Sequence, residues 1–299
     1  MRSSAHPGAR RAPAIRAVVA VVLSAALLFG SAAVYSEPEA PLTVSVFPRR
    51  NAALTMRMFR PLARYLEEKL GRRVQLRTSA SFGAFMRSLE LRRFDLIHLN
   101  QYQYIRAHDA YGYEAIAQNE EFGEGNIRSA IFVRKGSGIE SLEQLRGRRI
   151  IFGGDRSAMM SYILPTFVLR EAGLGPGDYQ ELFAVTPPNA VIATYLGRAD
   201  ACGVGEVVTQ LPIVSGKSDP EELRTVATSA PFPHLPWAVP ADMPEALKQR
   251  IHSLLLDLAN TAEGRQVLES AQLTGLSPAS DADYAPHRAI VRRVFSESE

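Results

Sequence analysis

The sequence has little cysteine, since Cys202 is the only one among 299 residues. A lone thiol cannot form an internal disulfide bond, so a disulfide-stabilised framework is excluded. The chain also lacks the G-x-S-x-G, H-E-x-x-H and Walker-type motifs that indicate hydrolases, metallopeptidases and nucleotide-binding enzymes. Without a nucleophile paired to a base, a metal cluster or a phosphate loop, we predict a protein that is not an enzyme and holds no cofactor or metal.

Long apolar runs are also missing. An apolar run over residues 17–29 covers only 13 positions, whereas a helix that crosses a membrane needs about 20. A basic segment precedes this run and small residues follow it at 30–33, which is the order of a secretory signal peptide. We predict a signal peptide over residues 1–36 and export of the protein, with an uncleaved N-terminal anchor as the alternative.

Acidic residues are absent from the first 36 positions, and this distorts the overall charge. The calculated pI is about 9.1, but four arginines of that segment account for the basic surplus. The rest of the chain has 30 basic and 31 acidic residues, a net charge of −1. No basic footprint for nucleic acid remains.

Short apolar runs alternate with helical patterns along the rest of the chain. Strands are predicted at 42–47, 74–77, 95–99 and 130–134, with helices at 59–70, 82–91 and 102–111. After residues 135–138 the pattern restarts, with strands at 149–152, 182–185 and 199–204 and helices at 160–172 and 190–196. Three further helices are predicted at 244–260, 263–271 and 282–295. This alternation favours an α/β fold, and the restart indicates a second, similar lobe.

A set of ordered markers runs through the same region. They are Phe47-Pro48, residues 61–66, Leu70-Gly71, residues 94–96 followed by Tyr104, residues 134–139, residues 142–147, residues 155–165 and residues 197–201. In order and spacing these markers resemble the phosphonate-type periplasmic solute-binding proteins of ABC importers. The resemblance covers nearly the whole chain after the predicted signal peptide.

The resemblance implies a type II periplasmic-binding-protein fold, with two α/β lobes that close around a ligand by a hinge. Lobe one would comprise residues 41–134 and 230–299, and lobe two residues 135–229. It also implies a monomer in the periplasm that binds a small molecule and delivers it to an ABC permease in the inner membrane. A sensor kinase ectodomain is the alternative partner.

Ligands of open α/β sheets bind beyond the carboxyl ends of strands, where helix N-termini present N–H groups. This rule and the resemblance select four loops, at residues 47–51, 98–103, 153–162 and 186–189. The predicted ligand-binding residues in and around them are Phe47, Arg49, Phe82, Asn100, Gln101, Tyr104, Arg128, Ser157, Met159, Met160, Ser161, Thr186, Asn189 and Glu206.

Several of these residues have a structural alternative. Arg49 is suited to pair an anion or to lie in solvent. Phe82 and Tyr104 match an aromatic residue and a tyrosine of the family, but both are equally suited to packing. Glu206 follows a predicted strand, where it would receive a ligand amine, line the hinge or start a helix.

The sequence departs from the family where a phosphonate would be held. The family carries Ser-Thr-Ser-Gly in the third loop, whereas this chain has Ala158, Met159, Met160 and Ser161. Thioethers cannot donate hydrogen bonds. The ligand histidine of the family falls at Thr186 or Pro187.

Two interpretations of the ligand stay open. In one, an anion is held by backbone N–H groups, Ser157, Ser161, Arg49 and Arg128. In the other, a less anionic and partly apolar ligand lies against the two methionines. A soft metal bound by the methionines is a third idea, but no tight ligand spacing supports it.

Overall fold

Two β-sheets organise the computed structural model, which describes Met1, residues 40–48 and residues 50–296. The predicted signal peptide and Arg49 lie outside the described residues. In the first sheet the strand order is β13-β4-β12-β3-β1-β2. Its strands are β1 (Leu42–Val46), β2 (Val74–Thr78), β3 (Leu96–His98), β4 (Tyr113–Glu120), β12 (Pro236–Pro240) and β13 (Gly275–Pro278).

The second sheet has the order β10-β6-β9-β7-β8. Its strands are β6 (Ser129–Arg134), β7 (Arg149–Gly153), β8 (Gln180–Ala184), β9 (Ala201–Gly205) and β10 (Leu223–Thr228). In each sheet three strands run parallel, β2-β1-β3 in the first and β8-β7-β9 in the second. Their carboxyl ends therefore meet at one edge of each sheet.

Two neighbouring segments join the sheets. Strand β5 (Asn126–Ile127) leads from the first sheet to the second, and β11 (Phe232–Pro233) leads back. The two strands pair antiparallel, with Ile127 opposite Phe232. Because β6 already pairs with β9 and β10, the chain enters the second sheet at Ser129, ahead of the predicted boundary at residue 134. The assignment of the remaining residues to lobes stays a prediction.

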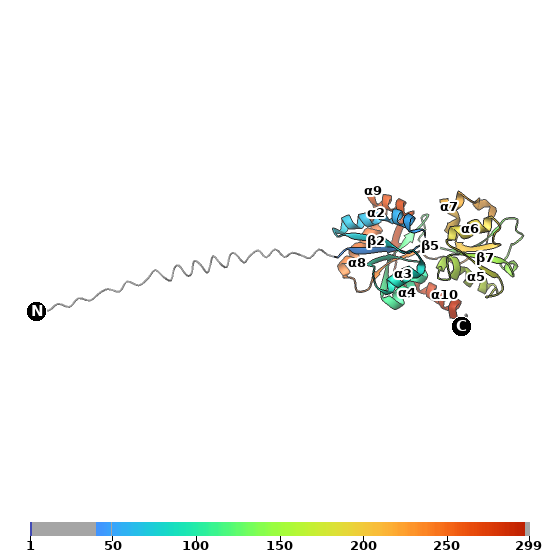
Figure 1. Ribbon diagram of the computed structural model, residues 1–299, viewed down its shortest axis with the longest axis horizontal. Coiled ribbons are helices and arrows are strands. Elements are labelled where there is room, and N and C mark those ends of the chain that lie inside the picture. The colour runs from blue at the N-terminus through green and yellow to red at the C-terminus, as the bar shows by residue number, and fades with distance from the viewer. Residues whose placement is uncertain (2–39, 49, 297–299) are drawn as a thin grey trace. The chain divides into compact units, whose positions relative to one another are not determined.

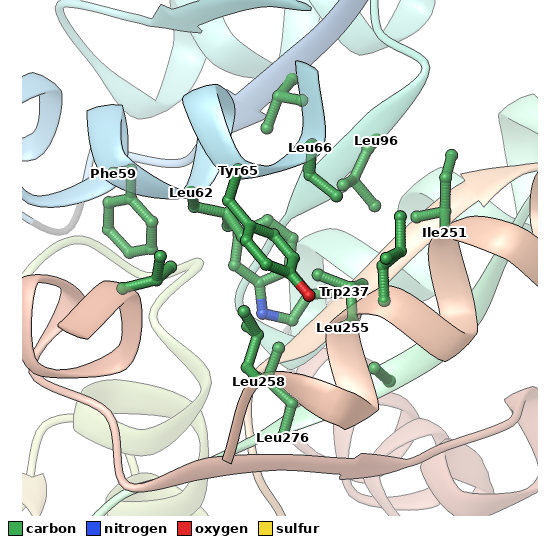
Figure 2. Close-up of a cluster of buried hydrophobic side chains, with 14 of the residues drawn as sticks. Phe59, Leu62, Tyr65, Leu66, Leu96, Trp237, Ile251, Leu255, Leu258 and Leu276 are labelled. Atoms are coloured by element: carbon green, nitrogen blue, oxygen red, sulfur yellow. The ribbon is translucent and has the colours of Figure 1, made fainter. Parts of the chain in front are cut away.

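Helices cover both faces of the first sheet. The core clusters place α2 (Ala52–Leu70), α8 (Glu245–Leu256) and α9 (Ala262–Ala271) on one face, and α3 (Phe82–Glu90) and α4 (Gln101–Tyr111) on the other. Figure 1 shows α2 and α9 on the opposite side of the sheet from α3 and α4. Leu62 and Leu66 lie one turn apart on α2 and pack with Trp237 and Leu255 in a buried cluster (Figure 2). On β3 the buried Leu96 joins this cluster while Ile97 joins the cluster beneath α3 and α4, because successive side chains of a strand point to opposite faces.

The second sheet is covered in the same way. A π-helical turn, η2 (Met159–Ile163), continues into α5 (Leu164–Glu171) on one face, and α6 (Pro187–Tyr195) and α7 (Pro212–Ser215) lie on the other. Cys202 is buried beneath α6, and burial raises the pKa of its thiol to about 12. The lone cysteine is therefore an unreactive core residue.

The last helix, α10 (Ala285–Ser296), packs against α5. Its Ile290 and Val294 belong to the apolar cluster of the second sheet, and Arg293 pairs with Glu171 at 2.6 Å. None of the helices in the described part of the chain is both long and apolar enough to cross a membrane.

Candidate functional site

One pocket opens where the carboxyl ends of the parallel strands face helix N-termini; we call it the cleft pocket. It encloses about 630 Å³ of space that protein atoms do not fill, solvent at its mouth included. Its lining residues are Phe47, Pro48, Phe82, Asn100, Gln101, Ile127, Gly153, Gly154, Ala158, Met159, Met160, Ser161, Val185, Pro187, Gly205, Val207, Val208, His234 and Leu235. They come from both sheets and from the two joining segments.

Asn100 and Gln101 form the polar part of the first-sheet wall. Asn100 caps α4, because its side chain accepts a hydrogen bond from the Gln103 amide at 2.8 Å. Its Nδ2 also donates to the carbonyl of Ser157 at 3.2 Å, so one side chain links α4 to the loop after β7. The Gln101 and Tyr102 amides occupy the first two positions of α4, where a helix supplies no acceptor.

The π-helical turn forms the facing wall. Ala158 O accepts from the amides of both Tyr162 and Ile163, at 2.8 and 3.1 Å, which widens the turn. The amides of Met159, Met160 and Ser161 lie at the open end of this turn, and all three side chains are buried. In the described part of the chain, the Ser161 hydroxyl makes no hydrogen bond and remains able to donate to a ligand.

The start of α6 adds an apolar wall. Thr186 is its N-cap, and Pro187 and Pro188 occupy the first two helical positions. Proline has no N–H, so this helix end lacks the donors that α4 offers. Gly153 permits the close approach, because a Cβ there would lie 2.4 Å from Pro187 Cα.

Ionised side chains are rare around the cleft pocket. Among its described lining residues there is no Asp, Glu, Lys or Arg, and His234 is the one ionisable side chain. His234 Nδ1 accepts from the Leu235 amide at 2.7 Å, which leaves the proton of a neutral ring on Nε2. That Nε2 lies 3.8 Å from the carboxylate of Glu121, itself buried. Elsewhere too, the described residues form no group of three or more His, Cys, Asp or Glu that would hold a metal ion.

The structure brings together about half of the residues that the sequence analysis selected. The predicted residues that line the cleft pocket are Phe47, Phe82, Asn100, Gln101, Met159, Met160 and Ser161. Ser157 lies outside it, in a separate opening with Tyr102 and Phe183, and its hydroxyl donates to Asp155 at 2.5 Å. Arg49 follows the lining residue Pro48 but is outside the described residues, so its role stays a prediction.

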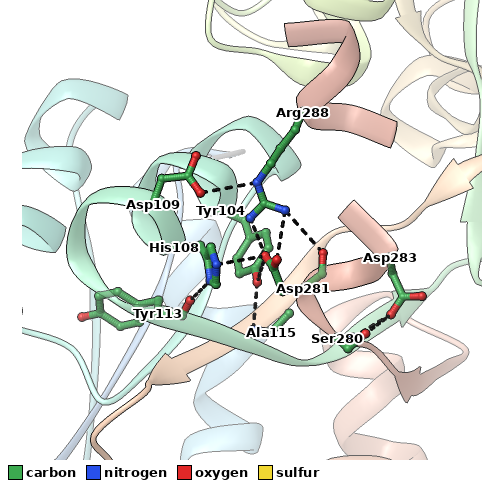
Figure 3. Close-up of polar contacts among 9 residues, drawn as sticks. All are labelled: Tyr104, His108, Asp109, Tyr113, Ala115, Ser280, Asp281, Asp283 and Arg288. Carbon is green, nitrogen blue, oxygen red and sulfur yellow. Dashed lines mark hydrogen bonds and ion pairs between the residues drawn. The ribbon is translucent and has the colours of Figure 1, made fainter. Parts of the chain in front are cut away.

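Tyr104 lies in the core instead. It is fully buried, donates to Asp281 at 2.9 Å and accepts from the Ala115 amide at 3.2 Å (Figure 3). Burial raises the pKa of its hydroxyl. Asp281 also accepts from Arg288 on α10, so the cluster ties α4 to the C-terminal helix.

The other predicted residues surround the cleft pocket without lining it. Glu206 accepts from the Arg128 amide at 3.3 Å, and the Arg128 guanidinium donates to the Ser229 carbonyl at the same distance. Arg128 therefore follows the joining strand β5 directly, and Glu206, which follows β9, is hydrogen-bonded to it. Thr186 lines a neighbouring groove, and Asn189 is exposed on α6.

The sequence analysis missed Val185, Pro187, Val208 and His234 as lining residues. Pro187 is one of the two positions where the family histidine falls, and Val185 directly precedes them, so this place was the available signal for both residues. Val208 and His234 carried no such signal, because only tertiary packing brings them to the pocket.

Comparison with known proteins identifies the family. Residues 44–284 match the family described as "ABC transporter, phosphonate, periplasmic substrate-binding protein". The chain belongs to this family of periplasmic substrate-binding proteins. The resemblance inferred from the sequence is therefore confirmed.

Solved structures share the fold. XAC2383 from Xanthomonas citri, bound to chloride ion, has 20% identity and a TM-score of 0.73 over 86% of this chain and 99% of its own. PhnD1 from Prochlorococcus marinus, in complex with methylphosphonate, has 17% identity and a TM-score of 0.75 over 85% and 97%. The alkanesulfonate-binding protein SsuA from Xanthomonas axonopodis pv. citri, bound to MOPS, has 16% identity and a TM-score of 0.57 over 88% and 94%. The predicted type II fold is confirmed.

Proposed function

We propose that this protein captures a small organic oxyanion with a single negative charge and an apolar substituent, and delivers it to an ABC permease. The observation that carries the proposal is the make-up of the cleft pocket. Donors from two helix N-termini and Ser161 lie beside methionine, proline and valine side chains, with no ionised residue among the described lining.

The donors favour an anionic head group. The N-terminus of an α-helix carries a partial positive charge, and its first amides lack acceptors within the helix. The starts of α4 and of the η2–α5 helix both reach the cleft pocket, through Gln101 and through Met159 to Ser161. An oxyanion between them would accept hydrogen bonds from these amides and from the Ser161 hydroxyl.

The lining of the cleft pocket favours a ligand with a single negative charge. Burying a second negative charge is costly unless a cation neutralises it. Arg128 does not supply that cation, because it does not line the cleft pocket and its guanidinium points to the Ser229 carbonyl. A ligand amine would lack a carboxylate partner, because neither Glu206 nor any other Asp or Glu is among the described residues that line the cleft pocket.

The remaining wall favours an apolar substituent. Met159 and Met160 are 1% and 8% exposed, and both line the cleft pocket. Thioethers and proline rings donate no hydrogen bonds but pack well against carbon chains. Of the two interpretations that the sequence left open, this wall supports the partly apolar ligand.

Closure of the cleft around the ligand is part of the proposal. The hydrogen bond from Asn100 to Ser157 links the first-sheet side to the second-sheet side, and the paired β5 and β11 offer a place for a hinge. We keep import as the role and the permease as the partner. If deletion of the gene leaves uptake of the ligand intact but abolishes a transcriptional response to it, a sensor kinase is the partner instead.

Thermal unfolding with a panel of ligands tests the proposal, since a ligand that binds only the folded protein raises the melting temperature. The panel contains short alkanesulfonates, alkylphosphonates and carboxylates, inorganic phosphate and sulfate, small amines and metal ions. We expect organic monoanions to give the largest shifts. A response to amines or metal ions alone contradicts the proposal.

A paired variant tests the apolar wall. In Met159→Ser with Met160→Thr, the affinity for the best organic anion should fall, because contacts with its substituent are lost. The affinity for inorganic phosphate should rise, since two hydroxyl donors are gained. Unchanged affinities for both ligands would show that the methionines do not contact the ligand.

A further inference from the structure

A second opening adjoins the cleft pocket, and we call it the tail groove. Its lining residues are Arg50, Asn51, Leu54, Thr186, Pro187, Pro188, Val208, Leu211, Pro212, Ile213 and Gln272. Pro187 and Val208 line both openings. The tail groove therefore lies next to the cleft pocket, on the other side of this pair of residues.

The floor and sides of the tail groove are apolar. Val208 and Leu211 are 5% and 7% exposed and belong to the core of the second sheet, which fixes them in place. Ile213 is 52% exposed, although it is a large apolar residue. Arg50, Asn51 and Gln272 provide a polar rim on the α2 and α9 side.

Each opening also has an exposed apolar side chain in its lining. Val185, which lines the cleft pocket, is 85% exposed, and Ile213 in the tail groove is 52% exposed. Neither exposure helps the protein to fold, because exposed apolar surface is not removed from water. An apolar side chain that lines an opening is available to contact a carbon chain there.

We propose that the tail groove receives the outer part of the ligand's apolar substituent, so that the substrate class is an organic oxyanion with an unbranched carbon chain rather than a one-carbon compound. This inference rests on the proposed function. With the oxyanion at the helix N-termini, the chain leaves the cleft pocket between Pro187 and Val208 and lies against Leu211 and Ile213. Because Pro187 and Val208 line both openings, the proposed occupant of the tail groove is the ligand of the cleft pocket itself.

The inference predicts how the affinity depends on the length of the ligand's carbon chain. Each methylene group moved from water into apolar surroundings increases affinity about fourfold. A ligand held only in the cleft pocket would lose this gain as soon as its chain reached solvent. A ligand that continues into the tail groove would keep it over further carbons.

The test is isothermal titration of the purified protein with unbranched alkanesulfonates of one to eight carbons. We expect affinity to rise up to fourfold per methylene across the longer members. In Ile213→Asp the rise should disappear for the longer members, while the affinity of the one- and two-carbon members stays within twofold. Leu196→Asp is the matched control, because Leu196 is also 52% exposed but lines neither opening. In this variant the affinity should still rise with chain length as it does in the unmodified protein.

The titrations distinguish a failure of the tail-groove inference from a failure of the proposed function. If short members bind and added carbons bring no gain, the tail groove is not used and the proposed function stands. If the rise is the same in Ile213→Asp and in Leu196→Asp, the chain lies elsewhere and the inference is overturned. If no organic oxyanion of any length binds, the proposed function and this inference fall together.

Discussion

The N-termini of α4 and α6 both border the cleft pocket, one from each half of the protein, but they differ in chemistry. Each follows a strand of a parallel set and borders the cleft pocket. The start of α4 presents Asn100, Gln101 and free amides, whereas α6 begins with Pro187 and Pro188, which have no N–H. The fold thus fixes where a ligand lies, while the first residues of each helix decide which part of the ligand is accepted there.

The largest expected effect comes from Gly153→Ala, which breaks the placement of α6. The new Cβ would lie 2.4 Å from Pro187 Cα, a backbone atom that cannot turn aside. We expect a loss of about 1–3 kcal/mol in the free energy of unfolding and a loss of ligand affinity, measured by chemical denaturation and titration. Gly175→Ala is the control, since its nearest neighbour lies at 3.9 Å. Equal stability of the two variants would contradict the close packing of α6 on β7.

A second effect separates the two roles of Asn100. Asp caps a helix as well as Asn does, so the cap should survive in Asn100→Asp, but the buried charge and the lost hydrogen bond to Ser157 should lower the free energy of unfolding by about 1–3 kcal/mol. The substitution removes the donor to Ser157 and places a negative charge beside the ligand's head group. We expect affinity for an organic anion to fall more than tenfold.

Thr261→Asp provides the control for this variant. Thr261 caps α9 by accepting from the Gly264 amide at 2.9 Å and does not line the cleft pocket. Its replacement should leave affinity unchanged. If Asn100→Asp binds as tightly as Thr261→Asp, the anion does not lie at the start of α4.

A smaller effect is expected when α6 is made more like α4. Pro187→Ala keeps the Cα and Cβ that pack on Gly153 and adds an N–H at the first helical position. Affinity for inorganic phosphate should rise about two- to fivefold, the contribution expected of one favourable helix-end contact. Pro212→Ala restores an N–H to α7, outside the cleft pocket, and should not change affinity. The same rise in both variants would show that the start of α6 does not face the head group.

The smallest expected effect concerns Arg49. If two helix N-termini and Ser161 suffice for the head group, Arg49→Gln should change affinity for an organic anion less than threefold. Titration at low and high salt measures this, since salt weakens the attraction of a distant cation far more than that of one in contact with the anion. A loss greater than tenfold would give the head group a cationic partner and remove the limit to one negative charge.

The sequence predicted the α/β class and most elements, because strand and helix patterns are local. It missed β4 (Tyr113–Glu120), where glutamate and glutamine interrupt the apolar pattern and pairing with β12 stabilises the strand. It also started α2 about two turns late, since the cap by Asn51 is a side-chain interaction.

The candidate site was predicted less well, because many of the residues that meet there are far apart in the sequence. Loops at strand ends could be selected by rule, and these contain Asn100, Gln101 and Ser161. The sequence analysis assigned Tyr104 to the cleft. Its hydrogen-bond partner Asp281 lies 177 positions away along the chain, so this contact could be recognised only in the folded protein. The apolar path past Val208 likewise depends on packing between distant segments.

Direct competition between an organic and an inorganic oxyanion tests the central claim. Titration calorimetry should compare pentanesulfonate, a monoanion with a carbon chain, with inorganic sulfate and phosphate. The account predicts that pentanesulfonate binds at least tenfold more tightly than either inorganic ion. Equal or tighter binding of sulfate or phosphate would contradict it.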